Sequence, residues 1–312
     1  MNVLVLSAGG PAAVGVIKSL RDMNFDGKIV AIDCDELAVG FQLADVYYVV
    51  PRTDNTNYIS EICNIINKDN IDLILPTGNN DIISISNKVE LFESLGVKVF
   101  MSDYDSIQLC NNKLAFYEKC KDKFLLPKTT DDICDAFLNN KLGSKVFAKP
   151  KMELGGSRGA TICNGYTHAL LLEENCEYIY QENLPGQEYT IDVLCDMESN
   201  PLVVIPRKRL QTKAGISSKG EIIRDNFIEK ACFDMCKFLK LKGPVCLQMK
   251  EDKDGKPKFV EVNPRFGGGT YFTTLAGVNF CKLIIDMLNG KELNIPKPKP
   301  ITVLRYFEEI VI

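Results

Sequence analysis

The first hundred residues alternate short apolar runs with amphipathic stretches, and this alternation constrains the fold more than any other feature of the sequence. Apolar runs of strand length lie at 2–6, 28–33, 46–50, 71–75 and 97–100. Helices are expected up to about Met23 and near 56–69 and 80–95. Strands that alternate with helices through short connections form parallel sheets with helices on both faces. Residues 1–110 therefore predict an α/β domain built on a doubly wound parallel sheet.

The pattern changes near Asn111, where runs with the spacing of hairpins replace the alternation of strands and helices. Strands are expected at 145–149, 160–163, 178–182, 187–195, 202–206, 244–250 and 258–263. Helices are expected near 112–121, 166–174, 225–240 and 275–289. This pattern is typical of an α+β domain, which we place at 111–295. A Pro/Lys connector then leads to a last strand at 301–306, within a C-terminal tail of 296–312.

Composition and charge exclude several classes of protein. The chain has 37 Lys and Arg against 41 Asp and Glu, so its net charge of -4 lacks the basic excess of a nonspecific nucleic-acid or membrane binder. No apolar run approaches the ~20 residues that span a bilayer, and the N-terminus lacks the basic start of a signal peptide. The 12 Cys include no CxxC pair, so we expect reduced, mostly buried thiols in a cytoplasmic protein. With His168 as the single His, a His-rich metal site or a Ser-His-Asp triad is not expected.

Two Gly-containing turns follow strands of the first domain, at 7–15 and 76–80. A strand-to-helix turn can bind an anion through backbone N–H groups and the helix dipole. The turn at 7–15 does not match the dinucleotide motif in its Gly spacing, nor the Walker motif, because Lys18 is not adjacent to Gly15. Asp33 does end the second strand, as the acidic residue of a dinucleotide site does. A tight turn without a ligand and a NAD-dependent oxidoreductase therefore both remain open for this domain.

The most informative segment is a hairpin expected between 244–250 and 258–263. Asp254-Gly255 is typical of a two-residue turn, and a turn at that point places Gln248 directly opposite Glu261. Two polar side chains of this kind on neighbouring strands can reach a common ligand.

Alternation along the second strand of this hairpin sorts its side chains onto two faces. One face carries Glu261, Asn263 and Arg265, and the other carries Val260 and Val262. A carboxylate with amide oxygens suits Mg²⁺, which takes its remaining ligands from water and phosphates. The alternative is a solvated polar face of the strand.

These residues resemble the ATP-grasp ligases, and in particular their carbamoyl-phosphate-synthetase-like branch. The sequence from Glu261 to Arg265, together with Gln248, is similar to the metal-binding strand pair of that family. Lys113 resembles the lysine that opens the grasp region, and Lys149 resembles the strand lysine that binds ATP phosphates. The resemblance thus implies a metal set of Gln248, Glu261 and Asn263.

Two further segments resemble nucleotide contacts of the family and occur in the expected order. The segment 155–159 resembles the mobile lid loop, which implies ATP contacts from Gly155, Gly156, Ser157 and Gly159. The segment 180–189 resembles the adenine hinge and the ribose-binding Glu, which implies contacts from Gln181, Glu182, Asn183, Leu184 and Glu188. A plain hairpin loop is the alternative for 155–159.

The resemblance covers roughly residues 111–290 and implies an ATP-grasp domain of two subdomains, with the lid subdomain at about 120–185. Residues 1–110 resemble the pre-ATP-grasp domain that usually precedes it. The implied activity is an ATP-dependent ligase that couples a small-molecule carboxylate to an amine, with Mg²⁺ or Mn²⁺ as cofactor. No nucleic acid or membrane partner is expected, and a homodimer is left open. A nucleotide-binding regulatory protein without turnover is the remaining alternative.

Charged residues near the metal strand are candidates for the chemistry itself. Arg265 can stabilise a developing acyl phosphate, and Lys149 can act on the phosphate side. Candidate contacts to the acceptor substrate are Asp192, Arg207, Arg209 and Gly268. The two arginines at 207 and 209 would otherwise form a solvated edge.

Overall fold

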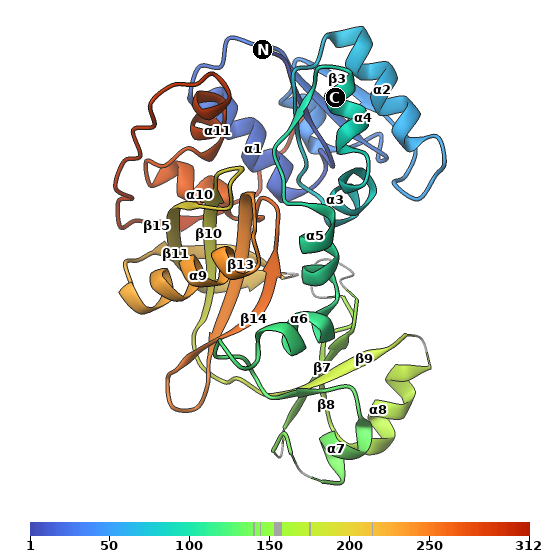
Figure 1. The fold of residues 1–312 in the computed structure, drawn as a ribbon, viewed down its shortest axis with the longest axis vertical. Coiled ribbons are helices and arrows are strands. Elements are labelled where there is room, and N and C mark those ends of the chain that lie inside the picture. The colour runs from blue at the N-terminus through green and yellow to red at the C-terminus, as the bar shows by residue number, and fades with distance from the viewer. Residues whose placement is uncertain (140, 144, 153–157, 175, 214) are drawn as a thin grey trace.

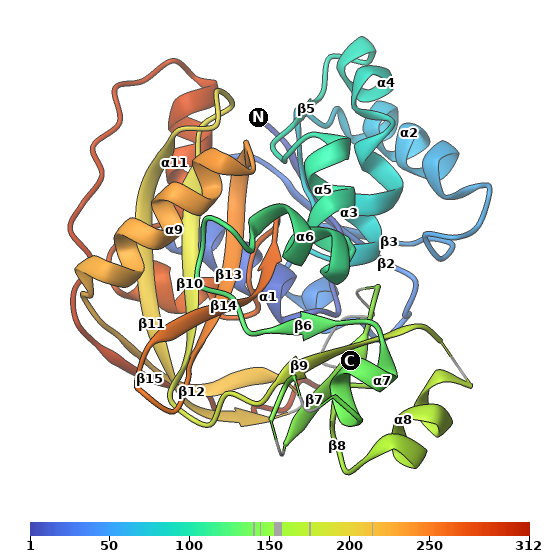
Figure 2. The same cartoon turned by 60° about the horizontal axis from the view of Figure 1, so that its bottom comes forward.

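Three β-sheets organise the chain (Figures 1 and 2). The computed structural model describes residues 1–139, 141–143, 145–152, 158–174, 176–213 and 215–312. A five-stranded sheet is formed by the N-terminal part of the chain. A four-stranded sheet follows it in sequence and lies at the opposite end of the molecule. A six-stranded sheet is formed by the C-terminal half of the chain. No helix in these ranges is long and apolar enough to cross a membrane.

The five-stranded sheet is parallel and follows the order β3-β2-β1-β4-β5. Its strands are β1 (Val3–Val5), β2 (Ile29–Asp33), β3 (Val46–Val49), β4 (Leu73–Leu75) and β5 (Lys98–Val99). Helices on both faces explain why the central strands are apolar throughout. One face packs on α1 (Pro11–Asp22), and the other packs on α2 (Tyr58–Asp69), α3 (Asn79–Ser86) and α4 (Val89–Ser94). The expected doubly wound sheet is therefore confirmed, although the helix expected at 80–95 is two helices separated at Asn87 and Lys88.

The four-stranded sheet follows the order β6-β9-β7-β8 and is antiparallel. Its strands are β6 (Thr129–Thr130), β7 (Val146–Pro150), β8 (Thr161–Cys163) and β9 (Tyr178–Glu182). The short helices α7 (Ile133–Phe137) and α8 (Tyr166–Glu173) pack on it around a small core of its own. We call this sheet together with α7 and α8 the lid. The helices α5 (Tyr104–Asn111) and α6 (Lys113–Cys120) connect it to the N-terminal sheet.

The six-stranded antiparallel sheet follows the order β14-β13-β10-β11-β12-β15. Its strands are β10 (Glu188–Cys195), β11 (Pro201–Lys213), β12 (Ile216–Ile222), β13 (Gly243–Glu251), β14 (Pro257–Asn263) and β15 (Thr302–Leu304). Helix α9 (Asn226–Phe238) covers one face. On the other face α10 (Thr270–Leu275) and α11 (Phe280–Leu288) share one hydrophobic core with α1, so the N-terminal and C-terminal parts pack as one body. The expected α/β plus α+β architecture is thereby confirmed.

One expectation for this half is wrong, and one strand was missed. The helix expected at 275–289 is interrupted, because Gly277 has a φ of 99° and Asn279 starts α11 by accepting a hydrogen bond from the Lys282 N–H at 3.1 Å. The strand β12 was not expected, because its Ser, Lys, Gly and Glu residues lack a strand-like apolar pattern. It forms because both of its edges are paired, with β11 and β15.

The hairpin of β13 and β14 places Gln248 opposite Glu261, as predicted, but by a different route. The turn has three residues rather than two: the Asp252 N–H donates to the Lys256 carbonyl at 3.0 Å, and Gly255 adopts a φ of 75°. A β-bulge at Val260 then restores the predicted register.

The bulge also changes the faces of β14. Val262 is buried in the core under α9, whereas Val260 lines a cavity beside Glu261. The prediction that Val260 and Val262 share one face is therefore wrong, because an extra residue in a strand reverses the alternation that follows it.

Candidate active site

Two cavities meet at the β13–β14 hairpin. The first, of about 460 Å³, lies between the N-terminal sheet and the six-stranded sheet, and we call it the inter-module cavity. The second, of about 290 Å³, lies between the lid and the six-stranded sheet, and we call it the lid cavity. Arg158, Gln248 and Glu261 line both. Two ligands bound in these cavities would therefore meet at a wall made by these three side chains.

The lid cavity collects most of the residues predicted to bind ATP. It is lined by Lys113, Lys149, Gln181, Glu182, Asn183, Leu184, Glu188, Gln248 and Glu261, among others. Lys149 is 7% exposed, and its Nζ donates to the carbonyl of Val260 at 2.8 Å. The carbonyl of the bulged residue therefore fixes this ammonium beside Glu261.

The predicted adenine hinge lies along one side of the lid cavity. The Gln181 amide donates to the Thr129 hydroxyl at 2.7 Å, and the Glu182 N–H donates to the Lys128 carbonyl at 3.0 Å. The Glu182 carboxylate accepts from the ammonium of Lys258. Since Glu182 uses its N–H and its carboxylate within the protein, Asn183 and Leu184 are the better candidates for contacts to a base.

The predicted ribose ligand, Glu188, begins β10 and lines the lid cavity. Its carboxylate pairs with Arg209, which lines the inter-module cavity and also donates to the Gly215 carbonyl at 2.6 Å. The Arg209 side chain is 6% exposed, so the alternative of a solvated edge is wrong for this residue.

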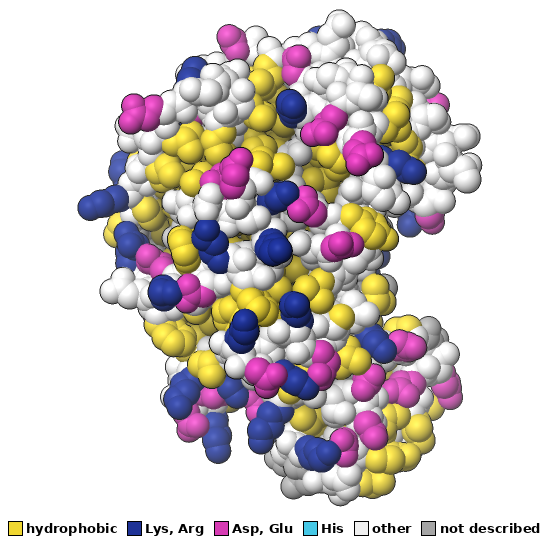
Figure 3. Space-filling view, in the orientation of Figure 1, with side chains coloured by type: hydrophobic (Ala, Val, Ile, Leu, Met, Phe, Trp, Pro, Cys, Tyr) yellow, Lys and Arg dark blue, Asp and Glu magenta, His cyan; other side chains and the backbone are white. Residues whose placement is uncertain are grey.

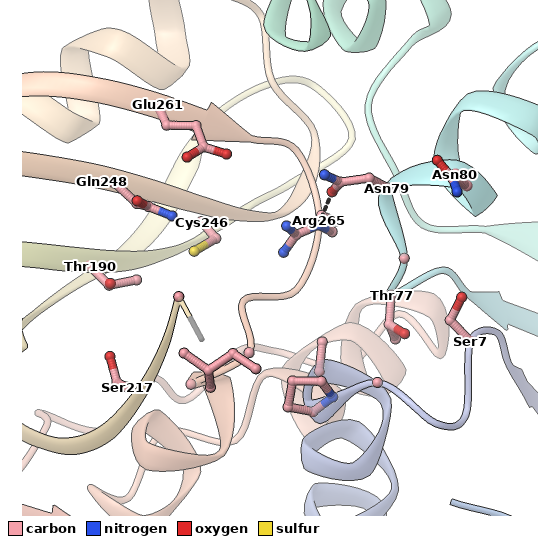
Figure 4. Close-up of a pocket in the computed structure, with 18 of the residues that line it drawn as sticks. Ser7, Thr77, Asn79, Asn80, Thr190, Ser217, Cys246, Gln248, Glu261 and Arg265 are labelled. Carbon is pink, nitrogen blue, oxygen red and sulfur yellow. Dashed lines mark hydrogen bonds between the residues drawn. The ribbon is translucent and has the colours of Figure 1, made fainter. Parts of the chain in front are cut away.

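Glu261 and Gln248 form the predicted metal face, and Figure 4 shows their side chains entering the same space from neighbouring strands. The Asn263 amide donates to Glu261 Oε1 at 2.8 Å. Asn263 is buried behind Glu261 and, as far as the structure is described, lines neither of the two cavities. A carboxylate oxygen and an amide oxygen facing one cavity fit Mg²⁺, which keeps several water or phosphate ligands. Asn263 thus supports Glu261 in this structure, and its place in the metal set stays a prediction.

Arg265 follows β14 and lines the inter-module cavity. Its Nε donates to the Asn79 side-chain carbonyl, its Nη1 to the Phe266 carbonyl at 2.8 Å, and its Nη2 to Asn263 Oδ1 at 3.4 Å. Figure 4 shows the contact between Arg265 and Asn79, which comes from the N-terminal module. Sequence reasoning missed Asn79, although the Pro76–Asn80 turn was singled out as a candidate ligand-binding edge.

Arg207 and Asp192 form a buried ion pair, with both side chains 1% exposed and Nη1 2.8 Å from Oδ2. The Thr273 hydroxyl donates to the same carboxylate at 2.7 Å, and Arg207 also donates to the Gly269 carbonyl at 3.1 Å. Arg207 lines the inter-module cavity, but the described residues along that cavity do not include Asp192. Asp192 is therefore placed as the buried partner of Arg207, away from the acceptor side predicted for it. The solvated edge is also wrong for Arg207.

A buried hydrogen-bond network holds the turn that carries Asn79. Asp81 accepts from the Ser7 hydroxyl at 2.5 Å, from the Tyr58 hydroxyl at 2.8 Å and from the Gly78 N–H at 3.2 Å. Burial raises the pKa of the Asp81 carboxyl against the opposing effect of these donors. The network ties the start of α3 to the turn after β1 and to α2.

The remaining predicted residues fall in different places. Gly268 lines the inter-module cavity, close to Pro11 at the start of α1. Gly159 has a φ of 74°, and its carbonyl accepts from the Tyr178 hydroxyl at 3.1 Å. Gly155, Gly156 and Ser157 lie outside the described residues. The groups of at least three His, Cys, Asp or Glu that a soft or transition-metal site needs are absent from the described part of the chain.

Comparisons with known proteins find family models that match two parts of the chain. Residues 3–100 match a family model described as the N-terminal domain of PylC-like proteins, and residues 174–310 match one described as an ATP-grasp in the biosynthetic pathway with Ter operon. The carbamoyl phosphate synthase large chain of Methanobrevibacter smithii is 24% identical over 271 residues, which are 80% of this chain and 25% of that protein. The D-alanine–D-alanine ligase of Thermotoga petrophila is 30% identical over 140 residues, or 42% of this chain and 46% of that protein. The chain thus spans less than half of either relative.

The fold itself has clear counterparts among solved structures. N5-carboxyaminoimidazole synthetase from Staphylococcus aureus, complexed with ADP, has a TM-score of 0.75 at 16% sequence identity. The similarity covers 98% of this chain and 82% of that one. It therefore includes the N-terminal sheet, the lid and the six-stranded sheet together.

Proposed function

Because the chain belongs to the ATP-grasp superfamily, we propose that it is an ATP-dependent ligase that joins a small-molecule carboxylate to an amine. The observation that carries this proposal is the wall that the two cavities share at Gln248 and Glu261. ATP in the lid cavity would direct its terminal phosphate to that wall. A carboxylate in the inter-module cavity would approach the same wall from the other side. In-line phosphoryl transfer requires this arrangement, with the attacking and leaving oxygens on opposite sides of the phosphorus.

The reaction then follows in two steps. A carboxylate oxygen attacks the γ-phosphorus, and the bond from that phosphorus to the bridging oxygen breaks. ADP is the leaving group, and an acyl phosphate is formed. The lone pair of the amine next attacks the acyl carbon, the carbon–oxygen bond to phosphate breaks, and the amine's proton passes to solvent. The products are an amide, ADP and phosphate. An enclosed cavity also limits hydrolysis of the acyl phosphate.

The side chains of this chain supply charge and position rather than a covalent nucleophile. Lys149, held by the Val260 carbonyl, and Lys113 would neutralise phosphate oxygens in the lid cavity. Glu261 and Gln248 would hold Mg²⁺ or Mn²⁺, which supplies charge neutralisation of the triphosphate. Arg265, facing the other cavity, would stabilise the acyl phosphate oxygens.

A NAD-dependent oxidoreductase is not favoured by any contact of the first module. The residue that would hold the ribose, Asp33, uses one carboxylate oxygen to accept from the Gly9 N–H at 2.7 Å and the other to accept from the Asp35 N–H at 2.9 Å. Asp33 therefore braces the turn after β1. A regulatory protein without turnover is opposed by the intact set of Lys149, Glu261 and Arg265.

We also propose the domain division made from the sequence, with a pre-ATP-grasp domain at 1–110, an ATP-grasp domain at 111–295 and a tail at 296–312. A cytoplasmic location is supported by the cysteines, which are all free thiols and mostly buried. Small molecules are the proposed substrates, because two cavities of about 460 and 290 Å³ hold metabolite-sized ligands.

A phosphate-release screen tests the proposal. The protein would be incubated with Mg²⁺-ATP and with bicarbonate or the common amino acids, singly and in pairs, and product masses would be measured for the pairs that respond. We expect phosphate release that depends on a carboxylate and a product whose mass is the sum of the pair minus water. The absence of carboxylate-dependent phosphate release with every compound and every pair would contradict the proposal.

A further inference from the structure

The arginines on the six-stranded-sheet side of the inter-module cavity differ in what holds them. Arg207 pairs with Asp192, and Arg209 pairs with Glu188, so each of these guanidinium charges is compensated by a carboxylate. Arg265 forms no ion pair with any residue in the described ranges, and its three side-chain hydrogen bonds there all go to amide or backbone carbonyl oxygens. Arg265 is thus fixed in position while its charge stays uncompensated.

The nearest carboxylate on the strand is kept apart from this guanidinium by an amide. Asn263 donates to Glu261 through Nδ2 at 2.8 Å and accepts from Arg265 through Oδ1 at 3.4 Å. On the other side of Arg265, the N-terminal module contributes Asn79, again a neutral acceptor. Figure 4 shows the Asn79 amide reaching across from the start of α3 to the guanidinium.

An aspartate in place of Asn79 would gain three favourable interactions, which oppose the cost of a second carboxylate near Asp81. An Asp would form an ion pair with Arg265. It would remove the Asn79 Nδ2 donor, which is buried with no hydrogen-bond partner among the described residues and is unfavourable in that state. It would also place a negative charge at the first residue of α3, where the helix dipole favours one. A neutral side chain at this position therefore forgoes an ion pair with Arg265 and leaves its own donor unpartnered within the described ranges.

We infer that Asn79 is a neutral positioning residue: it fixes Arg265 from the N-terminal module without cancelling the charge that the acyl phosphate needs. This inference rests on the proposed function. It assigns to the Pro76–Asn80 turn a role in the chemistry of the six-stranded sheet. It also explains why the network of Ser7, Tyr58 and Asp81 anchors that turn so firmly.

The decisive variant is Asn79→Asp, which keeps the acceptor oxygen and the shape of the side chain and adds the compensating charge. We expect its thermal midpoint to equal or exceed that of the wild type and its affinity for Mg²⁺-ATP to be unchanged. Its kcat with the carboxylate found in the phosphate-release screen should fall at least about tenfold, since the loss of one stabilising donor at a developing anion costs about 10²–10³. Asn79→Ala should also lower kcat, because Arg265 loses its fixed position.

Asn87→Asp is the matched control, because it adds the same charge to the exposed C-terminal end of the same helix. It should change kcat by less than about twofold, as expected for a screened surface charge. If Asn79→Asp turns over as fast as the wild type, Asn79 serves only to hold the two modules together and the inference is overturned. If the wild type shows no carboxylate-dependent phosphate release at all, the proposed function has failed and the inference falls with it.

Discussion

Replacing Asp192 with Ala removes the carboxylate that compensates the buried guanidinium of Arg207. Both side chains are 1% exposed, so water cannot replace the lost partner without entering the core. The Thr273 hydroxyl, which donates to the same carboxylate at 2.7 Å, loses its acceptor as well. Breaking a buried pair by removing one partner costs about 3–5 kcal/mol.

The expected loss is therefore about 3–5 kcal/mol in the free energy of unfolding, which corresponds to a thermal midpoint lower by roughly 6–15 °C. The double variant Asp192→Ala with Arg207→Met separates charge from packing. It should recover at least about 2 kcal/mol relative to Asp192→Ala, because an apolar side chain leaves no uncompensated charge in the core.

Urea unfolding of the wild type and the two variants, followed by circular dichroism, measures both differences. A loss below about 1 kcal/mol for Asp192→Ala would show that the Arg207 charge is solvated, and a double variant less stable than the single one would show that the pair acts through packing. In either case the buried-pair assignment would be wrong. The prediction that Asp192 contacts the acceptor would then return.

Two further pairs of variants test the two cavities. Lys149→Ala should weaken ATP binding by at least about tenfold. Lys151→Ala removes only surface ion pairs and should change ATP affinity by less than about twofold. Equal losses of affinity in calorimetric titration would refute the assignment of Lys149. Gly269→Ala should destabilise the protein by about 1–3 kcal/mol, because its Cβ would overlap the guanidinium of Arg207, which the buried pair with Asp192 keeps from moving aside. Gly268→Ala should be tolerated, because the nearest atom to its Cβ is 3.4 Å away, and similar thermal midpoints for the two Gly variants would contradict this packing.

The parts of the fold that local pattern determines could be predicted from the sequence. The parallel sheet follows from apolar strands separated by amphipathic helices. Strands of this kind need helices that cover both faces of their sheet. The pairing of Gln248 with Glu261 was also predicted, but two errors cancelled in it. A three-residue turn shifts the register by one residue and the bulge at Val260 shifts it back. Bulges depend on tertiary packing, so the local sequence around Val260 did not predict this one.

The parts of the site that long-range contacts determine could not be predicted. Asn79 and Arg265 are 186 residues apart in the chain and meet because the N-terminal part packs against the six-stranded sheet, through α1 on α10 and α11 and through α5 between α3 and β14. Sequence spacing likewise identified Arg207 as a charged residue on a strand, but not the carboxylate that neutralises it. The strand β12 was missed because pairing on both edges, rather than its composition, holds it in place.

Transfer of labelled oxygen tests the central claim most directly. The carboxylate identified by the phosphate-release screen would be labelled with ¹⁸O in its carboxyl group and incubated with Mg²⁺-ATP, the amine and the protein. If the carboxylate attacks the γ-phosphorus to give an acyl phosphate, one ¹⁸O atom must leave with each released phosphate, and the nucleotide product must be ADP. Unlabelled phosphate, or AMP with pyrophosphate as products, would contradict a ligase that works through an acyl phosphate.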